Sequence, residues 1–154
     1  MCTVCINNIK KQKSNKEQTN IIFLLIFVIN CELKMKFSFV YLGPIAIDQV
    51  DPQGNFIVVE NAGSTGKDQD LKGWTLRRKI DSRDEIIYKF PDNFTLKSRS
   101  RIRILTRNAS KGSVNDKDTL VAEGIQTWGT GTTMVTRLVD VNGDEKALYN
   151  QKFQ

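Results

Sequence analysis

From residue 44 onward, apolar and polar residues alternate in short runs, and turn residues interrupt these runs at intervals of about 8–12 residues. Alternation with a period of two places every second side chain on one face, which is typical of half-buried β-strands. The pattern therefore predicts an all-β, antiparallel β-sandwich of eight or nine short strands with little helix. The expected strands are residues 45–50, 56–60, 74–78, 85–90, 94–96, 101–106, 119–121, 134–139 and 147–149.

Several turns between these strands have clear sequence signals. Asp51-Pro52-Gln53-Gly54 combines a proline that presets φ with a glycine that accepts the positive φ of a tight turn. Asn142-Gly143 is a hairpin signal, because both residue types tolerate positive φ. Gly129 and Gly131 are likewise expected to adopt positive φ and to hold Trp128 over one end of the sandwich.

Residues 1–43 differ from the remainder in composition. Ile, Asn, Lys, Phe, Met and Tyr fill more than half of this stretch but under a third of residues 44–154. These amino acids have AT-rich codons, so translated intron or misjoined upstream sequence would have this composition. We expect residues 1–43 to be a disordered or foreign low-complexity extension without core contacts, and residues 44–154 to be the domain. The apolar block 21–29 is too short to span a bilayer, which takes about 20 residues, and a signal-peptide cleavage pattern is missing after it.

The chemistry available to the chain is narrow. It contains no histidine, which removes the commonest general base and the commonest metal ligand near neutral pH. All three cysteines precede residue 44, and Cys2-x-x-Cys5 is half a zinc or redox site without a second pair. Asp140-x-Asn142-x-Asp144 lacks the distal glutamate of a calcium loop and is interpreted as a turn. We therefore predict no enzymatic activity, no cofactor and no metal.

Large apolar side chains on the expected strands should form the core. An aromatic side chain buries on the order of 200 Å², so packing explains these positions better than ligand binding does. Trp74 is expected to be an anchor of this core at the start of its strand. The predicted core residues are Trp74, Leu76, Tyr88, Phe90, Phe94 and Trp128.

One group of cations is a candidate for partner binding. Residues 44–154 carry a net charge of only +2, because six lysines against two glutamates give residues 1–43 +4 of the total +6. A run with period two is expected to line one face of an extended segment and could bind an acidic protein or phosphates. The same charges could instead form a solvated face or an edge that deters strand pairing. The run consists of Lys97, Arg99, Arg101 and Arg103, with the nearby Arg77, Arg78 and Lys79 as candidates to extend it.

Five segments follow one another in a characteristic order and spacing along residues 44–154. They are Gly54-Asn55-Phe56-Ile57 to Asn61, Gly73-Trp74-Thr75-Leu76-Arg77-Arg78, Ile87-Tyr88-Lys89-Phe90-Pro91 through Phe94-Thr95-Leu96-Lys97, Thr127-Trp128-Gly129-Thr130-Gly131, and Thr136-Arg137-Leu138 with Gly143-Asp144-Glu145-Lys146-Ala147. Together they resemble the lamin-tail domain, the immunoglobulin-like domain near the C-terminus of intermediate-filament proteins. The resemblance is closest to the cytoplasmic intermediate-filament proteins of invertebrates, and it implies an immunoglobulin-like β-sandwich without an active site.

This resemblance implies three alternative functions. The first is the tail of a cytoplasmic intermediate-filament protein, with filament or other cytoskeletal proteins as partners and at most weak, non-specific nucleic-acid binding. The second is a nuclear lamin tail that contacts chromatin and nuclear-envelope proteins, and the third is a secreted binding module. Residues 150–154 form no prenylation box and Lys10-Lys11-x-Lys13 is a poor import signal, which favours the cytoplasm. No stretch sustains heptads, so a coiled-coil rod is either encoded upstream or missing from a free tail module.

Overall fold

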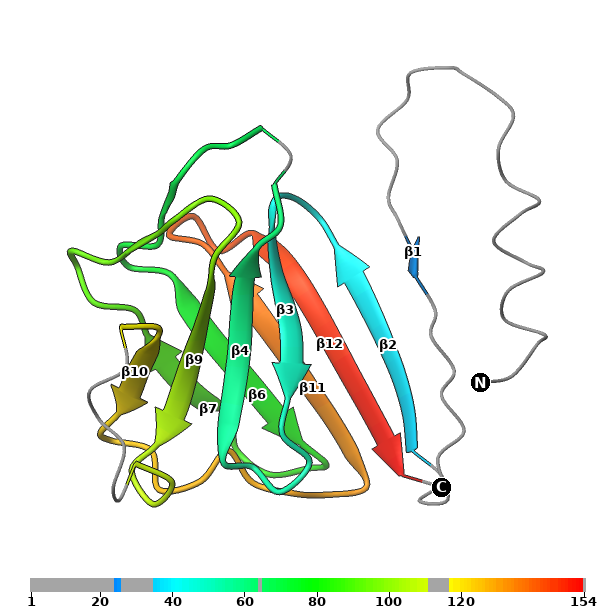
Figure 1. Ribbon diagram of the computed structural model, residues 1–154. Coiled ribbons are helices and arrows are strands. Elements are labelled where there is room, and N and C mark those ends of the chain that lie inside the picture. Colours follow the sequence, from blue (N-terminus) through cyan, green and yellow to red (C-terminus); the bar gives the residue numbers. More distant parts are fainter. Residues whose placement is uncertain (1–23, 26–34, 64, 111–116, 154) are drawn as a thin grey trace, which may run out of the picture.

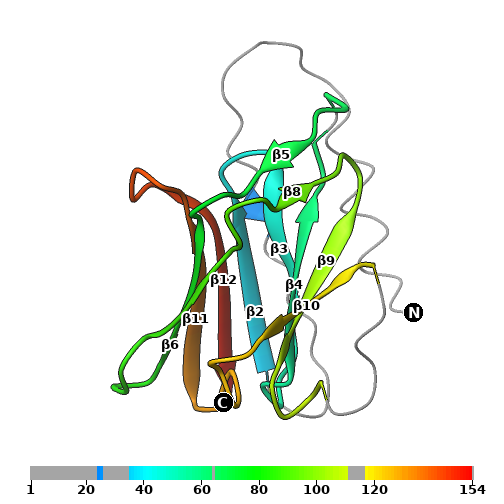
Figure 2. The same cartoon turned by 90° about the vertical axis from the view of Figure 1, so that its left-hand side faces the viewer.

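The computed structural model describes residues 24–25, 35–63, 65–110 and 117–153. Two β-sheets pack face to face in these residues, as the two views in Figures 1 and 2 show. The larger sheet has the order β1-β2-β12-β11-β6-β7, the smaller one has the order β10-β9-β4-β3, and β5 and β8 form a short separate pair. The strand bounds are β1 Leu24–Leu25, β2 Met35–Tyr41, β3 Ile45–Val50, β4 Phe56–Asn61, β5 Gln69–Asp70, β6 Thr75–Ile80, β7 Ile86–Lys89, β8 Thr95–Leu96, β9 Arg101–Thr106, β10 Thr119–Ala122, β11 Thr133–Val139 and β12 Glu145–Phe153.

Alternating side chains place the core between the two sheets. On β9, Ile102 and Ile104 are buried while Arg101 and Arg103 are exposed, as the period of two requires. On β6 the buried positions likewise alternate with half-buried ones. The prediction of an immunoglobulin-like β-sandwich is confirmed, and the expected strands correspond in order to β3, β4 and β6–β12.

Two features of the strand arrangement differ from the expectation. β10 runs parallel to β9, with Thr119 opposite Arg103, whereas the other described pairs are antiparallel. The pair β5 and β8 closes one end of the sandwich (Figure 2), and β5 lies in what we expected to be a loop. β5 consists of two polar residues, Gln69 and Asp70, which give no apolar alternation to recognise in the sequence.

The N-terminal extension contributes two strands, β1 and β2, to the larger sheet. β2 pairs antiparallel with β12 from Met35 opposite Phe153 to Tyr41 opposite Ala147, beside it in Figure 1. Phe37 packs against the core and meets the ring of Tyr149 edge-on, with centroids 6.0 Å apart. The expectation that residues 1–43 make no core contact is therefore wrong for Phe37. The cysteines and, apart from β1, the apolar block 21–29 lie outside the described residues.

The six expected core residues divide into two groups. Leu76, Phe90 and Trp128 are fully or almost fully buried. Trp74, Tyr88 and Phe94 are partly buried and pack against the same core. The tryptophan at the centre of the domain is thus Trp128, whose Nε1–H donates to the carbonyl of Ile104 at 3.2 Å, rather than Trp74.

Trp128 is held by a tight contact between two turns. Gly54, with φ 74°, accepts a hydrogen bond from the backbone N–H of Trp128 at 2.8 Å. A Cβ on Gly54 would lie 2.7 Å from the nitrogen of Gly129, which itself has φ 74°. Gly131 does not adopt positive φ, so that expectation is wrong; a Cβ there would instead overlap Asp81 and Ile80. Close approach of neighbouring atoms therefore favours glycine at Gly129 and Gly131, and positive φ favours it only at Gly129.

Arg78 is a fully buried cation that ties this loop to the larger sheet. Its guanidinium donates to the carbonyl of Trp128 at 2.8 Å, to Oγ1 of Thr136 at 2.8 Å and to Oε1 of Gln151 at 2.9 Å. Burial lowers the pKa of Arg78 to about 10, so the group remains charged at neutral pH. Neutral acceptors thus satisfy a charge that would otherwise be costly to bury.

Candidate protein-interaction surface

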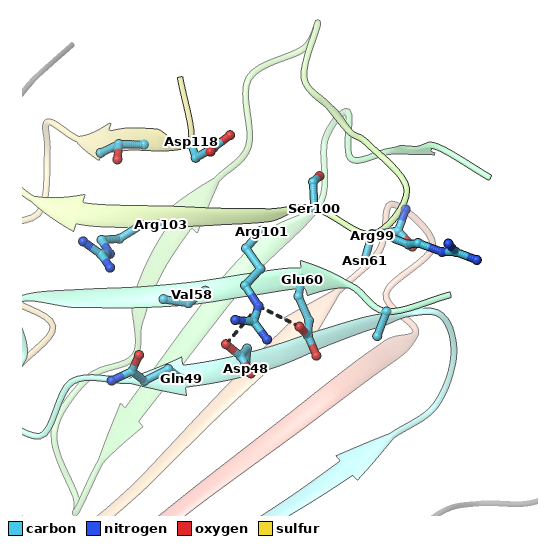
Figure 3. A pocket seen from close by; sticks show the side chains of 12 residues that line it. Asp48, Gln49, Val58, Glu60, Asn61, Arg99, Ser100, Arg101, Arg103 and Asp118 are labelled. Carbon is cyan, nitrogen blue, oxygen red and sulfur yellow. Dashed lines mark hydrogen bonds and ion pairs between the residues drawn. The ribbon is translucent and has the colours of Figure 1, made fainter. Parts of the chain in front are cut away.

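A furrow of about 800 Å³ crosses the outer face of the smaller sheet and contains most of the predicted basic run (Figure 3). Its floor is formed by the outward side chains of β3, β4 and β9. A β-bulge between Ile47 and Gln49 interrupts the alternation of β3. As a result, both Asp48 and Gln49 line the furrow while Val50 returns to the core.

The basic run does not form one extended segment. Ser98 and Arg99 lie in a turn, and Arg99 has a φ of 56°. β9 begins only at Arg101, so Arg101 and Arg103 share a strand face while Lys97 and Arg99 belong to the turn before it. The expectation of a single extended run is wrong because this turn brings Arg99 close to the end of β4, where its N–H donates to the carbonyl of Asn61 at 3.0 Å.

Two of the four cations are neutralised by carboxylates of the same domain. The Nε atom of Arg101 lies 2.9 Å from Oε2 of Glu60 and 3.4 Å from Oδ2 of Asp48 (Figure 3). The hydrogen bond to Glu60 and the charge of Asp48 raise the pKa of Arg101 further above its ordinary value. Lys97 lies 2.8 Å from Asp68, and this hydrogen bond lowers the pKa of the Asp68 carboxyl.

The other two cations have no carboxylate partner among the described residues. The guanidinium of Arg103 lies over the ring of Phe56, 5.0 Å from its centroid, in a cation–π contact. The exposed side chain of Arg99 makes no hydrogen bond, ion pair or ring contact with any residue that the structure describes. The furrow is lined by three carboxylates and three guanidinium groups, so its formal charge is balanced.

The additional cations considered with this run lie elsewhere. β6 belongs to the larger sheet, so Arg77, Arg78 and Lys79 do not reach the furrow. Arg78 is buried, and Arg77 lies 4.0 Å from Glu85. Counting Lys and Arg residues along the sequence therefore overstates the positive charge on the outer face of each sheet.

Sequence reasoning missed the carboxylates that balance the furrow. Glu60 lies opposite Arg101 in the register of β4 and β9, although 41 positions separate them in the chain. Asp48 joins them through the bulge in β3. On β4, Phe56 and Glu60 are half-buried whereas Ile57 and Val59 are fully buried, so Glu60 faces outward, but its partner strand was not identifiable from the sequence.

Two other kinds of site, for metal ions and for membrane crossing, are absent from the described part of the chain. It contains no group of three carboxylate, cysteine or histidine side chains placed to hold a metal ion. No helix there is long and apolar enough to cross a membrane. Asp140, which we interpreted as part of a turn, accepts hydrogen bonds from the N–H groups of Asn142 and Asp144 at 2.9 and 3.0 Å.

The two-sheet fold, with a charge-balanced furrow as its candidate site, defines a β-sandwich module of immunoglobulin type. Residues 42–153 match the Lamin Tail Domain family, and the chain belongs to that family. It is 42% identical over 110 residues to intermediate filament protein B of Ascaris suum, covering 71% of this chain and 18% of the relative. It is 36% identical to the 70 kDa neurofilament protein of Doryteuthis pealeii over 109 residues, which cover 71% of this chain and 17% of the relative. The identity to lamin-B3 of Xenopus laevis is 38% over 106 residues, 68% of this chain and 18% of the lamin. The chain thus matches under a fifth of each relative's length, and these relatives are named as filament proteins or lamins rather than enzymes.

Proposed function

We propose that this domain is the tail of a cytoplasmic intermediate-filament protein and mediates protein–protein contacts in the cytoskeleton. The observation that carries the proposal is the likeness of residues 42–153 to a small part of much longer filament proteins. The matched residues make up 18% of the length of the Ascaris suum relative, as expected for a tail that accompanies a longer filament-forming part. Relatives named for neurofilaments and for muscle-cell intermediate filaments support the cytoplasm.

The charge distribution supports a protein partner over a nucleic acid. Affinity for DNA depends on cations that are free to neutralise phosphates. Lys97 and Arg101 are already paired within the domain, which leaves Arg99 and Arg103. Two cations would give a log–log salt slope of about −2 and non-specific dissociation constants of about 10⁻⁴–10⁻⁶ M.

Co-sedimentation tests this proposal. The full chain is mixed with filaments assembled from intermediate filament protein B of Ascaris suum and, in parallel, with assemblies of lamin-B3 of Xenopus laevis. We expect saturable co-sedimentation with the former and weaker co-sedimentation with the latter. Equal or stronger association with the lamin, or none with the filaments, would contradict the proposal.

The likeness to lamin-B3 supports a nuclear lamin tail as the second candidate function. That function calls for tight chromatin contact, which a titration against duplex DNA at two salt concentrations measures. Nanomolar or sequence-selective binding would favour the nuclear alternative. Binding in the range given above, with the shallow salt slope, would favour the cytoplasmic one.

A further inference from the structure

Arg99 combines an unfavourable backbone conformation with an unused side chain. Its φ of 56° lies in the left-handed region, which residues other than glycine, asparagine and aspartate rarely adopt. The turn is fixed on both sides, because Arg99 N–H donates to the carbonyl of Asn61 at 3.0 Å and Asn61 N–H donates to the carbonyl of Ser100 at 2.9 Å. Asn61 is itself buried, and its side-chain amide donates to the carbonyl of Lys67 at 2.9 Å.

The fold gives no reason for an arginine at this position. Glycine would adopt the same φ without strain. The Arg99 guanidinium has no partner in the described residues and extends from the rim of the furrow into solvent (Figure 3). The surrounding hydrogen bonds hold Arg99 in a strained backbone conformation although its side chain makes no hydrogen bond, ion pair or ring contact with the described residues. Such strain indicates that the side chain serves binding rather than folding.

The second available cation lies further along the same segment. Arg103 faces the furrow from β9 and contacts Phe56 without a described carboxylate partner. Four residues of extended chain span about 13 Å, so the Cα atoms of Arg99 and Arg103 are at most about that far apart. Their guanidinium groups point toward opposite ends of the furrow (Figure 3). Between them, Arg101 is neutralised by Asp48 and Glu60.

This alternation of charge favours a particular ligand. A polyphosphate backbone carries closely spaced negative charges and would meet the carboxylates beside Arg101 as well as the free cations. An extended peptide can place acidic side chains at the two free cations and polar ones opposite the neutral centre. We propose that Arg99 and Arg103 bind two carboxylates, at least about four residues apart, in an extended acidic segment of a protein partner lying over β9.

This inference rests on the proposed function and refines it by naming the chemistry of the partner. The probe is a synthetic peptide rich in threonine and serine with two glutamates about four residues apart, beside the same peptide with glutamines. Binding to the full chain is measured by isothermal titration calorimetry at low salt. We expect the glutamate peptide to bind and the glutamine peptide to bind about tenfold or more weakly.

Variants separate binding from stability at Arg99. Arg99→Gly should lower the affinity for the glutamate peptide about threefold to tenfold, while the melting temperature stays the same or rises because the strain is relieved. Arg99→Lys should retain most of the affinity. Arg83→Gly is the matched control, since it removes one exposed positive charge from the turn between β6 and β7 and should leave binding unchanged.

Several results would overturn the inference. These are undetectable peptide binding, equal binding of both peptides, wild-type affinity in Arg99→Gly, and an equal loss in Arg83→Gly. Displacement of the peptide by duplex DNA at nanomolar concentration would also overturn it in favour of phosphate recognition. If the chain still co-sediments with filaments in any of these cases, the proposed function stands and only the partner chemistry fails.

Discussion

Truncation of the two tryptophans should have very different effects on the stability of the domain. Trp128 is fully buried, and its Nε1–H satisfies the carbonyl of Ile104 at 3.2 Å. Trp128→Ala therefore opens a cavity and leaves a buried carbonyl without its partner, which should lower the free energy of unfolding by about 3–5 kcal/mol. Trp74 is only partly buried at the edge of the core, so Trp74→Ala should cost about 1–2 kcal/mol.

The expected loss at Trp128 is large relative to the whole domain. Domains of this size are stable by about 5–15 kcal/mol, so the Trp128 variant should be marginally folded and the Trp74 variant clearly folded. Urea unfolding of the full chain, followed by far-UV circular dichroism, measures both values. Each variant retains one tryptophan, whose fluorescence reports the same transition independently.

The slope of each unfolding curve serves as the control. An unchanged slope shows that the shift of the midpoint reflects the folded state rather than a change in the compactness of the unfolded chain. A Trp74→Ala loss equal to or larger than the Trp128→Ala loss would refute the placement of Trp128 at the centre of the core.

Three further results are expected. Arg78→Met should destabilise the domain by about 2–4 kcal/mol, because it leaves buried acceptors without a donor, and a loss below about 1 kcal/mol in urea unfolding would contradict this. Deletion of residues 1–34 should change the unfolding free energy by less than about 0.5 kcal/mol. Deletion of residues 1–41, which also removes β2, should lower it by at least about 1 kcal/mol more. Equal stability of the two variants in thermal unfolding would show that β2 does not contribute. The hydrogen bond from Lys146 lowers the pKa of the Asp140 carboxyl, so its stabilising effect is present above the ordinary value of 3.8 and is lost as the pH falls through the lowered value. The difference in melting temperature between wild type and Asp140→Asn should therefore shrink below pH 3.8, and a constant difference would contradict the assignment.

The strands could be predicted from the sequence because each has one face toward the core. β9 is the clearest example, since Ile102 and Ile104 alternate with arginines and the strand has the predicted bounds Arg101–Thr106. The same alternation holds on β6, where Arg78 shares the inner face with Leu76. It could not indicate the acceptors of Arg78, because they come from β11, β12 and the loop at Trp128.

Features that depend on pairing between distant segments could not be predicted. The ion pair of Arg101 with Glu60 requires the register of β4 against β9. The contribution of Asp48 requires a bulge, which moves a side chain to the opposite face without a sequence signal that we recognised. The sequence therefore suggested four available positive charges in the basic run, although two of them are neutralised by ion pairs in the structure.

The strand from the N-terminal extension has a different cause. The alternating residues 35–41 fit the free edge of β12, but their composition led us to group them with the preceding low-complexity residues. An open edge pairs with any extended segment of suitable pattern, so the edge of the sheet rather than local composition determines where the domain begins.

Hydrogen exchange of the full chain, with and without filaments of the Ascaris suum relative, tests most directly whether the furrow is the surface that contacts filament proteins. Amides in the turn 97–100 and around the furrow on β3, β4 and β9 should be protected when filaments are present, and this protection should weaken in Arg99→Gly but not in Arg83→Gly. Protection confined to the larger sheet, or an exchange pattern that filaments leave unchanged, would contradict the account.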